Sequence, residues 1–186
     1  MNLYHFTDYV KMFRILKSGT LRTIRDTNFH NHQSFKGENE PAIFFTRNFN
    51  IMGTAINTRA CLEIDREELK RRYKLYPFNY FNDEDDYKSN PETVESEEII
   101  LKREIPLDNK LVKKIYFFES EDRKHFILQW FVHVFNIKAK TLKEVKDYIE
   151  EKHDIEVVFL RHENQVIPSK NKDKFKYLES FSTYFL

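Results

Sequence analysis

Three short segments, far apart in the chain, each combine an apolar run with a polar side chain that could do chemistry. They are residues 3–7 (LYHFT), residues 43–48 (IFFTRN) and residues 96–100 (SEEII). Each pattern predicts a short strand that begins or ends at a polar group. A histidine, an arginine and a glutamate placed in this way could bind a ribose, clamp a pyrophosphate and stabilise a developing positive charge.

The same three residues also have ordinary structural interpretations. His5 could be a buried, hydrogen-bonded histidine of a core strand. Arg47 could form a surface ion pair at a strand end, and Glu98 could close an acidic run at residues 83–98. The functional interpretation therefore depends on all three occurring in this order.

The elements that must position these segments do not alternate regularly between strand and helix, which favours an α+β fold. No glycine-rich turn joins a strand to a helix, so neither a Rossmann fingerprint nor a P-loop is present. Residues 22–41 predict a long functional loop, residues 49–58 could form a helix, and Pro106 predicts a turn or short helix. The expected helices are residues 8–17, 66–72, 121–135 and 141–152. The expected strands are the first of the three segments and, in addition, residues 42–46, 60–65, 97–102, 114–118 and 155–160.

The expected helix at residues 121–135 carries two neighbouring stripes of side chains. One stripe is polar and predicts a solvent-facing surface, whereas the other is apolar and predicts burial in the core. The polar stripe is His125, Gln129 and His133, and the apolar stripe is Phe126, Trp130 and Val134.

Taken in order, the three segments resemble the catalytic signature of ADP-ribosyltransferases, and in particular that of DarT-type toxins and related phage and abortive-infection proteins. The resemblance covers about residues 1–118. It implies split mixed or antiparallel sheets around an NAD cleft, with peripheral helices and no glycine-rich loop for the nucleotide. We expect residues 1–186 to form a single domain, in which residues 119–186 are a helical and strand part packed on the core.

The resemblance also assigns a role to each matching residue. Glu98 would be catalytic, because a carboxylate can stabilise an oxocarbenium-like ribose and accept a proton from the acceptor. Arg47 would be catalytic as a fixed cation that clamps the NAD phosphates or the acceptor. The residues expected to bind NAD are His5, Phe6, Thr7, Thr46 and Tyr73, the last by stacking, although aromatic residues near Pro77 could equally be packing.

Composition indicates the class of protein and the cellular compartment in which this chemistry is expected. A chain that is 40% hydrophobic and 33% charged fits a soluble globular protein. The single Cys61 excludes an internal disulfide and favours a reducing, cytoplasmic compartment. No leader and no run of ~20 apolar residues is present, so no membrane association is expected. His30 and His32 lack further ligands at a usual spacing, and no metal is expected.

The distribution of charged residues along the chain indicates which class of acceptor to expect. The net charge of +1 argues against indiscriminate nucleic-acid binding. Residues 66–76 nevertheless carry five cations and two anions, and this strip places Arg71 and Arg72 beside Tyr73. Cations next to aromatic rings suit a nucleic-acid acceptor, so these two arginines are expected to bind the substrate. A solvated surface, with a protein as the acceptor, is the alternative.

The sequence therefore predicts a cytoplasmic NAD-dependent ADP-ribosyltransferase acting on nucleic acid or protein, in phage–host conflict or in a toxin–antitoxin pair with an antitoxin or inhibitor partner. Two alternatives stay open. One is a non-catalytic binding or inhibitor module of the same fold. The other is a small ribonuclease that uses His5, Arg47 and Glu98 as base, phosphate clamp and acid.

Overall fold

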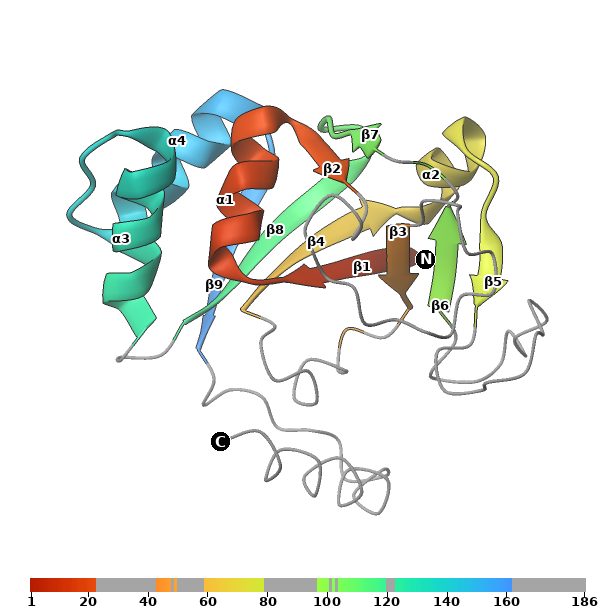
Figure 1. The fold of residues 1–186 in the computed structure, drawn as a ribbon, viewed down its shortest axis with the longest axis horizontal. Coiled ribbons are helices and arrows are strands. Elements are labelled where there is room, and N and C mark those ends of the chain that lie inside the picture. Colours follow the sequence, from red (N-terminus) through yellow and green to blue (C-terminus); the bar gives the residue numbers. More distant parts are fainter. Residues whose placement is uncertain are drawn as a thin grey trace, which may run out of the picture.

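The computed structural model describes residues 1–22, 43–47, 49, 59–78, 97–100, 102, 104–119 and 123–161 (Figure 1). Within these residues the chain forms four helices and nine strands, which confirms the predicted α+β class. The helices are α1 (Tyr9–Ser18), α2 (Arg66–Arg72), α3 (Lys124–Phe135) and α4 (Leu142–His153). The strands are β1 (Asn2–Thr7), β2 (Thr20–Arg22), β3 (Ile43–Thr46), β4 (Ala60–Asp65), β5 (Tyr76–Phe78), β6 (Glu97–Ile100), β7 (Glu104–Pro106), β8 (Val112–Glu119) and β9 (Glu156–Arg161).

Seven of the described strands form one mixed sheet in the order β5-β6-β3-β1-β4-β8-β9, and β2 pairs with β7 in a separate ribbon. Neighbouring strands are antiparallel except β8 and β9, which are parallel. β9 thus adds the C-terminal part of the described chain to the same sheet. The division of the domain at residue 118 stays a prediction.

The seven-stranded sheet changes direction between β1 and β3. These two strands share the residue pair Tyr4 and Thr46, whereas β1 and β4 pair along their whole length. Figure 1 shows β3, β6 and β5 running across the direction of β1 and β4. We call β5, β6 and β3 the edge half of the sheet, and β1, β4, β8 and β9 the long-strand half. The predicted split of the sheet therefore lies at this junction.

Local sequence signals account for the ends of the helices. The Asp8 carboxylate accepts a hydrogen bond from the Lys11 amide at 2.8 Å and so begins α1. Gly19 ends it with a φ of 68°, a left-handed conformation that favours glycine. Thr141 and Glu144 form a capping box at the start of α4.

The core lies between the long-strand half and three helices. Figure 1 shows α1, α3 and α4 gathered over β4, β8 and β9. The Phe13 ring of α1 stacks on Phe117 of β8 with 5.2 Å between centroids, and meets the Phe131 ring of α3 edge-on at 5.7 Å. All three side chains are fully buried. Among the described residues, no helix is long and apolar enough to cross a membrane.

Several sequence predictions are wrong. Pro106 belongs to strand β7 and pairs with Thr20, since a two-stranded ribbon tolerates a residue without an N–H. Arg22, assigned to a loop, ends strand β2 of the same ribbon. The region of Pro77, which is absent from the expected strands, forms strand β5, because β6 supplies a partner that local composition does not reveal. The rest of the expected loop at 23–41 and most of the possible helix at 49–58 lie outside the described residues.

Candidate active site at the strand junction

The three segments with candidate chemistry lie on three adjacent strands. β6, β3 and β1 carry them in that spatial order. Thr46 pairs with Tyr4 on one side and with Glu97 on the other, and so connects the two halves of the sheet. Glu98 lies opposite Phe45 on β3 and opposite Pro77 on β5. The fold thus brings together segments that are about 90 residues apart in the sequence.

His5 is fixed against β3 by a hydrogen bond and by ring packing. Its Nδ1 lies 2.9 Å from the carbonyl oxygen of Phe44, and its ring meets Phe45 edge-on at 6.1 Å. Because a carbonyl only accepts, Nδ1 carries the proton and donates, which leaves Nε2 of the neutral ring as an acceptor. Burial lowers the pKa of His5, the hydrogen bond to Phe44 opposes this, and the charge of Lys11 adds to the lowering. A neutral imidazole at pH 7 follows.

The neighbours of His5 lie as the strand period predicts. Leu3 is fully buried and Thr7 is nearly so, and both lie on the core side. The Thr7 carbonyl accepts a hydrogen bond from the Arg59 amide at 2.9 Å, which ties the end of β1 to the start of β4. Phe6 is half-buried, and its ring lies 6.4 Å from that of Tyr4.

Arg47 is the first residue after β3 and is half-buried. Thr46 before it is 5% exposed and is held in the ladders on both sides. Two residues after Arg47, the Phe49 ring packs against Tyr4 at 5.0 Å and against Tyr116 of β8 at 4.8 Å. In the sequence, Arg47 therefore lies between the end of β3 and an aromatic residue, Phe49, that packs on β1 and β8 of the other half of the sheet.

A buried carboxylate in this region was not recognised from the sequence. Glu63 lies opposite Tyr4 on β4 and is 8% exposed. The Tyr116 hydroxyl donates to it at 2.5 Å, and the Asn2 side-chain amide donates to its other oxygen. Burial, and then the hydrogen bond to Glu63, raise the pKa of Tyr116 far above its usual value. A glutamate inside the otherwise apolar run ACLEI was the available signal.

The candidate acceptor-binding arginines lie on α2, away from this junction. α2 follows Asp65, which pairs with Asn2 at the opposite end of β1 from Thr7. Arg72 donates to both carboxylate oxygens of Asp108 at 2.6 and 3.0 Å and to Glu68 at 2.6 Å. The guanidinium of Arg72 therefore holds α2 against the turn that precedes β8.

Arg71 and Tyr73 both lie at the C-terminal end of α2. Arg71 makes two hydrogen bonds to Glu68, at 2.7 and 2.8 Å, while its side chain stays 69% exposed. Tyr73 is the C-terminal cap of α2, is half-buried and packs against the core. It precedes β5 by three residues, and β5 in turn pairs with the strand that carries Glu98.

The described part of the chain holds no group of three or more histidine, cysteine, aspartate or glutamate side chains that could bind a metal ion. His30 and His32 lie outside it. Cys61 is fully buried on β4, and burial raises the pKa of its thiol well above the usual value. It therefore packs as a small apolar side chain.

No family model and no curated protein sequence matches the chain. Solved structures of DarT from Thermus sp. 2.9 are similar in fold. The complex with carba-NAD+ has a TM-score of 0.45 at 10% identity, over 87% of this chain and 96% of that chain. The complex with NAD+ has a TM-score of 0.43 at 11% identity, over 85% and 94%. The complex with ADP-ribosylated single-stranded DNA has a TM-score of 0.43 at 10% identity, over 75% and 91%. Because these scores lie below 0.5, we derive the function from the residues of this chain.

Proposed function

We propose that the protein is an NAD-dependent ADP-ribosyltransferase that modifies a nucleic-acid or protein acceptor. The observation that carries the proposal is the strand order β6-β3-β1, with the register that sets Glu98, Thr46 and His5 on neighbouring strands. A carboxylate, a cation and a neutral imidazole at one junction suit the cleavage of a glycosidic bond next to a phosphate-bearing ribose.

In this proposal the bond between C1′ of the ribose and the nicotinamide nitrogen breaks. Its electron pair leaves with nicotinamide, which becomes neutral, and the ribose becomes oxocarbenium-like. The Glu98 carboxylate stabilises this cation. A nucleophilic atom of the acceptor then bonds to C1′, and its proton passes to Glu98.

The other residues bind and orient NAD. The free Nε2 of His5 accepts a hydrogen bond from a ribose hydroxyl. Arg47, directly after β3, presents a fixed cation to the pyrophosphate. Phe6, Thr7, Thr46 and Tyr73 complete the NAD-binding set in the proposal.

For the acceptor, Arg71 is the better candidate of the two arginines. Its side chain is largely exposed, whereas two carboxylates engage Arg72. Charge reversal at Arg71 should therefore weaken modification of a nucleic-acid acceptor and leave NAD hydrolysis intact. Nuclease and protease treatment of the labelled products identifies the acceptor class.

The test is transfer of label from adenylate-labelled NAD to the macromolecules of a cell lysate. Glu98→Gln should reduce both label transfer and nicotinamide release at least about a hundredfold. Glu97→Gln is the matched control, because it removes the same charge one residue away. Equal activity of the two variants would remove Glu98 from the mechanism, and absence of transfer and of NAD turnover in all lysates would end the proposal.

A binding assay separates the alternatives. NAD at about a hundredfold over its dissociation constant should stabilise a transferase by roughly 2.7 kcal/mol. RNA cleavage without stabilisation by NAD indicates a ribonuclease, and binding of NAD without turnover indicates a non-catalytic module. Growth arrest on expression in bacteria, relieved by Glu98→Gln, would support a role in phage–host conflict or a toxin–antitoxin pair in the cytoplasm.

A further inference from the structure

Helix α3 exposes a surface that differs from the rest of this charged protein. Residues 125–137 contain no aspartate, glutamate, lysine or arginine, although 33% of the whole chain is charged. The neighbouring α4 carries seven charged residues among its 12. A solvent-facing helix normally carries charge on its outer face, so this surface is not simply a solvated one.

Large apolar side chains gather on this uncharged surface. Phe126 is 39% exposed, which overturns its predicted place in the core. Ile137, two residues beyond the end of α3, is 36% exposed, and Trp130 is half-buried between them. Phe126, Trp130 and His133 follow the i, i+4, i+7 spacing that places side chains along one line of a helix. Only Val134 of the predicted apolar stripe is well buried among the described residues.

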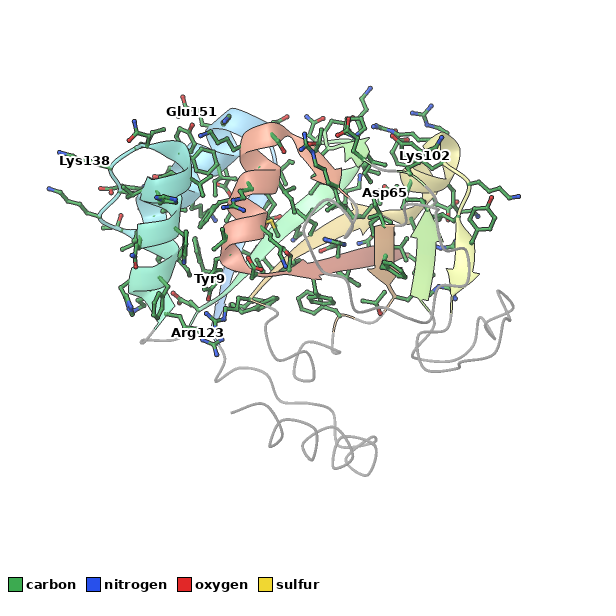
Figure 2. The ribbon with its side chains drawn as sticks, viewed as in Figure 1. Tyr9, Asp65, Lys102, Arg123, Lys138 and Glu151 are labelled. Atoms are coloured by element: carbon green, nitrogen blue, oxygen red, sulfur yellow. The ribbon has the colours of Figure 1, made fainter. Side chains whose placement is uncertain are left out.

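The charged residues that directly flank the uncharged stretch in the sequence, among residues 123–124 and 138–143, are all cations. Residues 123–143 contain no acidic residue, and cations flank the uncharged stretch on both sides. Figure 2 shows Arg123 and Lys138 near opposite ends of α3. On α1, which packs against α3, Arg14 is exposed, and Lys17 donates to the Val134 carbonyl at 2.7 Å. The partner that complements this surface is acidic at its borders.

The aromatic rings on this surface are better placed to pack against apolar side chains than to stack on nucleobases. The His125 ring already lies 3.9 Å from the centroid of Phe126. His133 meets Trp130 edge-on at 5.4 Å. Both aromatic rings thus have a neighbour where a stacked nucleobase would compete, and Ile137 offers no ring at all.

We propose that the outer face of α3 is a docking surface for an acidic amphipathic helix of another protein. The apolar line receives the anchors of such a helix, and the flanking cations pair with its carboxylates. The proposal is independent of the transferase activity. It predicts an interaction surface distinct from the strand junction.

Trp130 provides a direct readout, because it is the single tryptophan of the chain. The probe is a tryptophan-free synthetic peptide of about 18 residues, with leucines at i, i+3, i+4 and i+7 and glutamates elsewhere. Its matched controls are the same peptide with lysines in place of glutamates, and oligothymidylate. We expect a saturable change in fluorescence with the acidic peptide only, weakening as salt concentration rises.

Surface variants localise the binding. Phe126→Ser and Lys138→Glu should each weaken the acidic peptide at least about tenfold, because one removes an anchor and the other a complementary charge. Lys143→Ser on α4, whose side chain is 82% exposed, is the control and should bind normally. No saturable change, equal binding of the basic peptide, preference for the oligonucleotide, or self-association of the protein through this face would overturn the proposal.

Discussion

The two halves of the seven-stranded sheet differ in the length of their strands. The long-strand half has strands of six to eight residues, and three helices cover its core face. The edge half has strands of three or four residues. Shorter strands form fewer ladder hydrogen bonds, and this allows local opening at lower cost. Glu98 belongs to the edge half and Arg47 directly follows β3, so these two residues of the proposed chemistry lie on or next to the half with the shorter strands.

The largest expected effect is on the long-strand half. Phe117→Ala should lower the free energy of unfolding by about 3–5 kcal/mol, because it removes a buried ring that stacks on Phe13 and Phe159 and leaves a cavity beside them. Phe44→Ala, at a half-buried position of the edge half, should cost about 1–2 kcal/mol. Urea denaturation measures both. Equal losses would remove the difference between the halves.

The second-largest expected effect on stability concerns Glu63, the buried carboxylate near the junction of the two halves. Tyr116→Phe leaves Glu63 without one of its two donors and should cost about 1–3 kcal/mol. Lys114→Gln, on the same strand, breaks an exposed ion pair with Glu156 and should cost below about 1 kcal/mol. If denaturation shows the same small loss for both variants, Glu63 is adequately hydrated without Tyr116.

A third prediction concerns α2, which connects the last residue of β4 to β5. Hydrogen bonds from Arg71 and Arg72 lower the pKa of Glu68 to about 2. The folded pKa is below the ordinary 4.5, so this contribution to stability is complete above pH 4.5 and is lost as pH falls toward 2. Carboxyl titration by NMR should show the low pKa, and Arg72→Gln should raise it. An unchanged pKa in that variant would assign the shift to Arg71 alone.

The sequence predicts most strands of both halves, but it misses β5 and the ribbon of β2 and β7. Caps at Asp8 and Thr141, and an apolar run from Ala60 to Asp65, are local signals, and the elements they define are confirmed. The strand at Pro77 and the ribbon at Pro106 form through pairing with distant residues, which local composition does not encode.

The candidate site shows the same limit. Its three segments could be identified from residue type and spacing, but the positions of Phe49 and Glu63 in the site could not be predicted. Phe49 depends on rings from β1 and β8, and Glu63 on donors from β1 and β8, so both depend on a register set by the whole sheet.

The smallest expected effect is the pH dependence contributed by His5 at the junction. Burial lowers its pKa in the folded state below the ordinary 6.5, so below pH 6.5 the unfolded chain binds more protons. Stability should therefore be complete above pH 6.5 and fall as pH decreases toward the folded pKa. His5→Asn should reduce this dependence, measured as a change in Tm of about 2 °C between pH 7.5 and 5.5. His153→Asn is the matched control, because burial also lowers the pKa of His153, but far from the junction on α4. Only the His5 variant should also weaken NAD binding at pH 7.5. Weakening by both variants would mean that NAD affinity follows overall stability, and His5 would then have no separate role in binding NAD.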